Sequence, residues 1–198
     1  MTGRAFTLCA LLLAAAAPAA AQRASNGGFA ALGVAGADSR YLEPSWTIVF
    51  GWDRRWPVAR DFRLGVRGAA EYSRLEPDEA AYLDSLGLDA GEVDGGVASV
   101  VATGFDVLGG YRAGRFGGHL FAGIRYVRDR REELEIDSGG GVFTVRGDSD
   151  SGLGGTWGAG VTWDFGPAGL LAEYFRTGGF GDGRVQVEGV RAGVSWAW

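Results

Sequence analysis

The residues of this sequence best suited to chemistry are charged side chains that lie inside otherwise apolar, alternating segments. They are Arg63, Arg67, Glu71, Asp106, Arg112, Arg125, Asp164, Glu173 and Arg191, together with His119. In a shared interior they could form an ion path or gate. They could also form a salt-bridged plug, because five arginines and His119 stand against four carboxylates, and an unpaired buried charge is costly. Because most of these charges can pair with one another, we favour the salt-bridged plug. We expect any conductance through the barrel to be small and to rise when Arg63 or Arg67 is truncated.

The single histidine decides whether nucleophilic catalysis is available, because a Ser–His–acid triad would have to use His119. We expect no serine near it at the same depth, since Ser99 and Ser195 fall on other levels or faces. The pattern favours a structural histidine within the charge network. No catalytic, metal-binding or cofactor-binding residue is predicted.

Composition narrows the function classes further. The 198 residues suffice for one domain, and a formal net charge of -5 argues against a nucleic-acid partner. The only cysteine, Cys9, lies in the apolar core of an N-terminal leader. The mature chain would therefore have no disulfide, no thiolate metal site and no thiol nucleophile.

The N-terminus has the three parts of a secretory signal peptide. Arg4 supplies the positive start, residues 6–17 form an apolar core, and Ala19-Ala20-Ala21 offers an A-x-A cleavage site. The core is shorter than the roughly 20 residues that a membrane-spanning helix needs. We therefore expect cleavage near Ala21, which separates a signal peptide over 1–21 from a single domain over 22–198.

Eight segments of the mature chain alternate apolar and non-apolar residues with the period of a β-strand. They are 28–37, 46–53, 62–73, 101–112, 119–128, 156–165, 169–176 and 190–198. The connections 53–57, 113–115 and 166–168 are predicted as tight turns, and 38–45, 74–96, 129–152 and 177–184 as longer loops. An even strand count with alternating short and long connections is typical of bacterial outer-membrane barrels.

Large aromatic residues lie near the ends of the apolar faces, with aliphatic residues between them, while the opposite faces mix glycine with charge. The aromatic residues are Trp46, Trp52, Phe62, Tyr72, Tyr111, Tyr126, Trp157, Trp163, Tyr174 and Trp196. This layout is typical of interfacial girdles that flank a lipid-facing band roughly 25 Å tall. Backbone groups in hydrocarbon must pair internally, so the sheet has to close. The sequence predicts an all-β, eight-stranded antiparallel up-and-down transmembrane β-barrel preceded by a signal peptide, in preference to a lipocalin-like soluble barrel.

Three features are predicted in the long loops. Residues 132–147 should form a hairpin above the membrane, in which Leu134 and Ile136 face Phe143 and Val145. The loop 75–94 is acidic, and it is predicted as a solvated loop with one helical turn after Pro77. A divalent-cation bridge to lipopolysaccharide is the alternative there, without a calcium-loop pattern to support it. Arg146-Gly147-Asp148 matches an adhesive tripeptide, which is a weak signal.

The C-terminus carries the most specific signal. Val190, Ala192, Val194, Trp196 and Trp198 alternate up to a final aromatic residue, which looks like the assembly signal read by the outer-membrane insertion machinery, with tryptophan in place of the usual phenylalanine. With its eight strands and leader, the chain resembles the small outer-membrane β-barrel superfamily of outer-membrane protein A, outer-membrane protein X and the opacity proteins. The lipid A deacylase barrels are of similar size, but their His-x-Ser pair is absent, since 119–121 is His-Leu-Phe.

The resemblance implies an outer-membrane location in a Gram-negative-type bacterium and insertion by the barrel-assembly machinery. It also implies outer-membrane lipids and lipopolysaccharide as partners. The function we expect is non-enzymatic, either envelope-structural or surface interaction through the outer loops. The alternative is a porin-like small pore or a lipid-modifying enzyme.

Overall fold

A computed structural model describes residues 24–88, 91–180 and 185–197. The expected signal peptide at 1–21 lies outside the described residues. The long strands in the described part are β1 (Ser25–Ala37), β3 (Ser45–Pro57), β4 (Phe62–Pro77), β6 (Ala98–Ala113), β7 (Phe116–Arg131), β10 (Asp148–Asp164), β11 (Ala168–Gly179) and β12 (Gln186–Ala197).

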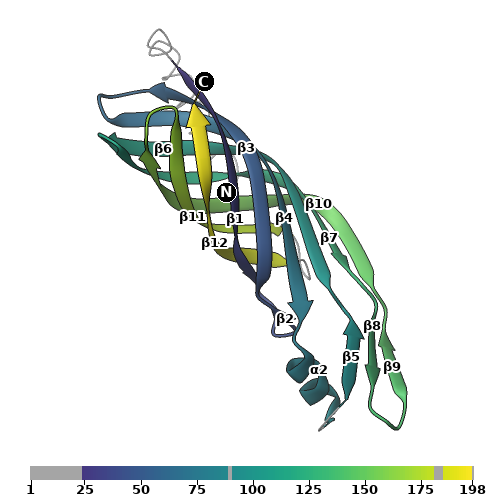
Figure 1. The fold of residues 1–198 in the computed structure, drawn as a ribbon. Coiled ribbons are helices and arrows are strands. Elements are labelled where there is room, and N and C mark those ends of the chain that lie inside the picture. The colour runs from purple at the N-terminus through teal and green to yellow at the C-terminus, as the bar shows by residue number, and fades with distance from the viewer. Residues whose placement is uncertain (1–23, 89–90, 181–184, 198) are drawn as a thin grey trace.

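These eight strands form one closed antiparallel barrel, as predicted. They are ordered β4-β3-β1-β12-β11-β10-β7-β6, and β4 pairs with β6 to close the ring. Strands that are neighbours in the barrel are also neighbours along the chain, apart from β1 and β12, whose pairing brings the two ends together. Figure 1 shows the tilted ring of strands. The topology is therefore up-and-down.

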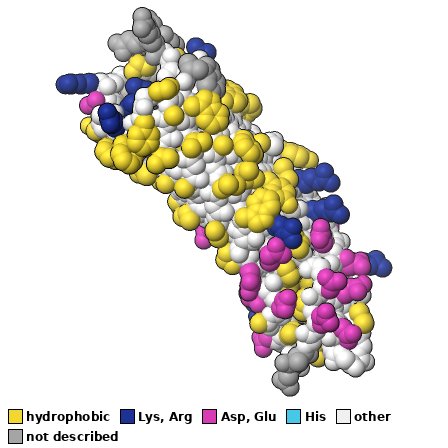
Figure 2. Space-filling model, in the orientation of Figure 1, with side chains coloured by type: hydrophobic (Ala, Val, Ile, Leu, Met, Phe, Trp, Pro, Cys, Tyr) yellow, Lys and Arg dark blue, Asp and Glu magenta, His cyan; other side chains and the backbone are white. Residues whose placement is uncertain are grey.

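The two faces of the wall follow the predicted alternation. Along β3, Trp46, Phe50 and Trp52 are exposed on the outside, whereas Thr47 and Val49 are fully buried inside. Apolar side chains cover the barrel half of the surface in Figure 2, and acidic side chains gather at the other end. No helix among the described residues is long and apolar enough to span a membrane.

The short connections lie at the same end of the barrel as residues 24–25 and Ala197. They are 58–61, 114–115 and 165–167. The prediction of a turn at 53–57 was wrong, because β3 continues through Pro57. Asp53 and Arg55 point inward and pair with each other, and Arg54 lies 5.6 Å from the Trp56 ring. These contacts satisfy three consecutive charges inside a strand. Following the rule for this fold, we call this end periplasmic and the opposite end outer.

The outer end is larger than the predicted loops suggest. β10 has 17 residues, which at about 3.3 Å each exceeds the span that lipid requires. Beyond the barrel lie β2 (Leu42–Glu43), α2 (Glu79–Leu86), β5 (Glu92–Gly95), β8 (Leu134–Asp137) and β9 (Val142–Val145). They project from one side of the ring, next to β4, β7 and β10 (Figure 1).

Helix α2 is the helical turn that was predicted after Pro77. Its N-cap, Asp78, accepts a hydrogen bond from the Ala81 N–H, and Gly87 ends it in a left-handed conformation. The Tyr82 ring lies 5.0 Å from the Tyr41 ring, and burial raises the pKa of Tyr82. These contacts hold the helix against the β1–β3 connection.

Candidate functional site

The middle of the lumen is occupied by one continuous chain of ion pairs. Its members alternate in sign and come from five strands, in the order Arg67, Glu173, Arg191, Glu71, Arg125 and Asp106. The joining N···O distances are 2.7, 2.9, 2.8, 3.9 and 2.6 Å. All six side chains are almost completely buried. Because three cations face three anions, this ionic layer is electrically neutral.

Glu173 is the most connected member of the ionic layer. Its Oε1 accepts from Arg67 Nη2 at 2.7 Å, and its Oε2 accepts from Arg191 Nε at 2.9 Å. His119 Nε2 lies 2.8 Å from the same Oε1. Arg67 Nη2 also lies 3.4 Å from Nε2, but the contact with Glu173 is shorter and a carboxylate can only accept, so the geometry favours a proton on Nε2. His119 therefore belongs to the charge network, as the sequence indicated.

Three inward phenylalanines hold the guanidinium groups of the ionic layer. The Arg67 guanidinium lies between the rings of Phe29 and Phe121, at 4.4 and 4.8 Å, and that of Arg191 lies 4.4 Å from Phe175. Such contacts stabilise a desolvated cation. None of the three was predicted as a site residue, although an aromatic residue on the charged side of a strand is a usable signal.

Glycine makes room for this layer. A Cβ at Gly160 would lie 2.6 Å from His119 Cε1 and 2.7 Å from Glu173 Cγ. Any larger residue at this position of β10 would displace both side chains. This close approach explains why glycine is frequent on the inward faces.

A second barrier fills the outer half of the lumen. Buried apolar side chains begin against the ionic layer at Phe121 and Phe175 and reach Leu42 and Leu75 at the outer end. The hydroxyl groups of Thr47 and Ser73 lie 2.9 Å apart, and those of Thr156 and Thr177 3.0 Å apart. These four hydroxyl groups are thus paired with one another. The lumen is closed twice, first by ions and then by apolar packing.

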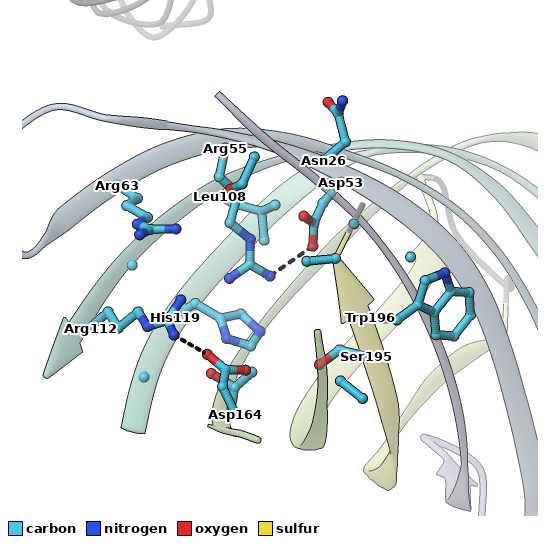
Figure 3. A pocket seen from close by; sticks show the side chains of 18 of the residues that line it. Asn26, Asp53, Arg55, Arg63, Leu108, Arg112, His119, Asp164, Ser195 and Trp196 are labelled. Carbon is cyan, nitrogen blue, oxygen red and sulfur yellow. Dashed lines mark hydrogen bonds and ion pairs between the residues drawn. The ribbon is translucent and has the colours of Figure 1, made fainter. Parts of the chain in front are cut away.

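The periplasmic end of the lumen remains open as a cavity of about 120 Å³, which we call the vestibule. Its charged and histidine lining residues among those described are Asp53, Arg55, Arg63, Arg112, His119 and Asp164. Figure 3 shows them around the cavity, with the Arg55–Asp53 pair at 2.7 Å and the Arg112–Asp164 pair at 3.1 Å. Ser195 lies on the opposite side.

The predicted charge set is thus divided between two places. Arg67, Glu71, Asp106, Arg125, Glu173 and Arg191 form the ionic layer, whereas Arg63, Arg112 and Asp164 line the vestibule. The expectation that no serine lies near His119 at the same depth stays a prediction, although Ser195 lines the same cavity. No hydrogen bond joins these two side chains. Asp53 and Arg55 were missed because their segment was predicted as a turn.

The ten predicted interface aromatics all lie on the outward wall. Tyr72 is partly buried, and the other nine are exposed. Neighbours pack together at both ends: Trp46 lies 5.2 Å from Tyr72 near the outer end, and Phe116 stacks on Trp163 at 5.6 Å near the periplasmic end. Their contact with the two lipid–water interfaces remains a prediction. Of the C-terminal signal, Val190, Ala192, Val194 and Trp196 face outward, and Trp198 lies outside the described residues.

The predicted outer hairpin is confirmed, including its register. Leu134 pairs with Val145, and Ile136 pairs with Phe143. β8 also pairs with β5, which makes a three-stranded sheet in the order β5-β8-β9. Arg146-Gly147-Asp148 lies where this sheet joins β10. In the described ranges, no group of His, Asp and Glu side chains could hold a metal ion.

The sheet is closed, its outer wall is apolar, and its lumen is charged and filled. These three features define a small β-barrel of the transmembrane type. No protein-family model matches the sequence, and no curated protein sequence matches it significantly. A major outer membrane protein from Thermus thermophilus aligns in structure with a TM-score of 0.55 at 13% identity, over 89% of this chain and 100% of that one.

Two further solved structures align more loosely. Ail, the attachment invasion locus protein of Yersinia pestis, aligns with a TM-score of 0.47 at 16% identity, over 88% of this chain and 97% of that one. Neisserial surface protein A aligns with a TM-score of 0.46 at 16% identity, over 89% and 100%. At such identities the likeness concerns the fold: this chain has the fold of the small outer-membrane β-barrels.

Proposed function

We propose that this chain is a non-enzymatic integral outer-membrane protein whose outer sheet binds an extended segment of another protein. The single observation that carries this proposal is the open edge of β9. Val142, Phe143, Thr144 and Val145 are all exposed, and β9 ends the order β5-β8-β9. An uncovered apolar edge strand is a template for pairing with a further strand.

The hydrogen-bonding pattern identifies which backbone groups the partner would meet. The Ser138 N–H donates to the Gly141 carbonyl, and bonded pairs alternate along an antiparallel ladder. Phe143 and Val145 therefore bond toward β8. The N–H and C=O groups of Val142 and Thr144 point to the open edge.

The two faces of the sheet specify the chemistry of the partner. Phe143 and Val145, each 48% exposed, present an apolar strip on one face. The other face carries carboxylates, because Glu135 pairs with Thr144, and Asp94 pairs with Glu135. Figure 2 shows the acidic side chains of this end. A complementary segment alternates apolar and basic residues.

The edge can be tested with the protein in lipid nanodiscs and two peptides, one alternating Val and Arg and one alternating Val and Glu. We expect the Val–Arg peptide to bind more tightly. Thr144→Pro should abolish this binding, because proline removes the outward N–H while leaving the β8 ladder intact. Thr144→Ala should preserve it. Equal binding of both peptides, or equal binding by the proline and alanine variants, would refute the proposal.

Location in the outer membrane rests on the apolar wall and the C-terminal pattern, through which we propose recognition by the barrel-assembly machinery. A folded barrel in outer-membrane fractions should migrate faster on gels before heating than after heating. Trp198→Phe should assemble like the wild type, and deletion of Trp198 should assemble poorly. Recovery of the protein in the soluble fraction would contradict this assignment.

We further propose that lipopolysaccharide phosphates contact β7 just beyond the outer aromatics. Arg128 and Arg130 follow the outward Tyr126 at intervals of two, so they share its face, and neither makes an ion pair with a described residue. Ser99 and Ser149 pair with Arg130 from the two flanking strands. Arginine with hydroxyl neighbours suits phosphate. Arg128→Gln with Arg130→Gln should reduce lipopolysaccharide retained on the purified barrel, whereas Arg54→Gln at the periplasmic end should not.

The two alternative functions are disfavoured by the lumen. His119 is held by Glu173 and not by a serine, which leaves no activated nucleophile at that position. A pore would have to cross both barriers. A lipid A mass profile that changed with expression of the protein would support the enzyme alternative instead.

A further inference from the structure

The vestibule carries more positive than negative charge. Arg55 is paired with Asp53, and Arg112 is paired with Asp164. Arg63 makes no ion pair with any residue that the structure describes. His119 shares its Nε2 proton with Glu173, whose charge is already balanced within the ionic layer. The described lining of the cavity therefore has one uncompensated guanidinium.

The arginines of the vestibule are arranged around the cavity and not along a strand. Arg63 comes from β4, Arg55 from β3 and Arg112 from β6 (Figure 3). Arg112 and Arg55 line the same cavity as Arg63, and the two carboxylates of its lining, Asp164 and Asp53, are already paired with them. Like charges in one cavity repel each other, so an anion placed among them lowers the energy of all three.

The vestibule also has neutral hydrogen-bond donors. Hydroxyl groups of Thr162 and Ser195 line the same cavity and supply neutral donors.

The position of the cavity in the barrel limits the route of a ligand. Its volume of about 120 Å³ can hold a small oxyanion together with several waters. The ionic layer closes the inner side, so a ligand must enter and leave by the periplasmic mouth. The vestibule can therefore hold an anion without conducting it.

We propose that the vestibule is a binding site for a small oxyanion, a phosphate or carboxylate group, held by Arg63 with Arg55 and Arg112. Guanidinium groups bind such oxygens through paired N–H donors. This site lies at the opposite end of the barrel from β9 and does not depend on the proposed surface role.

Residues 22–198 contain no cysteine, so an introduced cysteine can be labelled without competition from another thiol. Ser195→Cys in the mature protein in nanodiscs places a single thiol in the vestibule. Its reaction is timed with a sulfonate-bearing and a trimethylammonium-bearing methanethiosulfonate of similar size. We expect Arg63→Gln to lower the ratio of anionic to cationic reaction rates about tenfold, as the loss of one nearby charge would. Arg60→Gln, the same change in the exposed turn 58–61, should leave the ratio unchanged.

Binding of an anion is measured as protection of the introduced thiol from the anionic reagent. Inorganic phosphate and acetate, in separate arms, should each slow the anionic reagent several-fold when Arg63 is present, and the stronger protector identifies the preferred group. Neither should protect the Arg63→Gln protein. A rate ratio that is equal in the two arginine variants would overturn the proposal, and so would the absence of protection by both anions. The heat-dependent gel shift confirms that each variant is folded.

Discussion

At the scale of single residues, the lumen depends on one shared acceptor. Glu173 is contacted by Arg67, Arg191 and His119, so it binds side chains from three other strands, β4, β12 and β7, at once. Desolvation makes such a pair costly to assemble, but removing one partner costs more, because it leaves a buried charge uncompensated. We therefore expect the Glu173 carboxylate to contribute most of the stability that the ionic layer gives to the barrel.

We expect Glu173→Gln to reduce the free energy of unfolding by about 3–5 kcal/mol. Asp164→Asn is the matched control, because the Arg112–Asp164 pair at the mouth is partly exposed and should contribute less than about 1 kcal/mol. Urea unfolding in lipid vesicles, followed by tryptophan fluorescence, measures both. Equal stabilities of the two variants would show that the ionic layer does not hold the barrel together.

The inward glycines make a second residue-scale prediction. Gly160→Ala should destabilise the barrel by about 1–3 kcal/mol through overpacking, because the new Cβ would press on His119 and Glu173. Gly118→Ala lies close by on β7, where a Cβ would meet only the Gly160 carbonyl oxygen at 3.9 Å, and should be nearly neutral. The same urea titration compares them, and a stable Gly160→Ala protein would contradict the packing argument.

At the scale of elements, local pattern predicted the barrel well. The eight strands, the hairpin register and the helical turn after Pro77 follow from alternation and turn residues that lie next to one another in the chain. β5 could not be predicted in this way, because its partner β8 lies some 40 residues further on. The division of the charged set also escaped the sequence, since alternation gives the face of a residue but not its depth in a sheared barrel.

The outer hairpin should be separable from the barrel. Deleting 133–146 would join Glu132 to Gly147 between the paired Arg131 and Asp148, leaving a two-residue turn with a glycine that suits a tight hairpin. We expect the variant to keep its heat-dependent gel shift. Because β5 pairs with β8, hydrogen exchange should become faster over 91–97. Loss of the gel shift would show that the outer sheet is needed for barrel closure.

At the scale of the whole molecule, three zones follow one another along the barrel axis. The vestibule opens to the periplasmic end, the ionic layer crosses the middle, and apolar side chains fill the outer half. Two barriers of different chemistry in series mean that weakening either one alone should not produce an open pore. Among the described residues, the ionic layer and the apolar packing thus separate the two ends of the barrel.

This arrangement refines the expected conductance. In planar bilayers the wild-type protein should show no large, steady current. Arg63→Ala should leave the current unchanged, because Arg63 lines the vestibule and is not part of either barrier. Arg67→Ala removes a cation from the ionic layer and should give brief, small openings only, since the cluster from Phe121 to Leu75 still blocks the outer half. A steady wild-type pore, or a larger current from Arg63→Ala than from Arg67→Ala, would show that ions bypass both barriers.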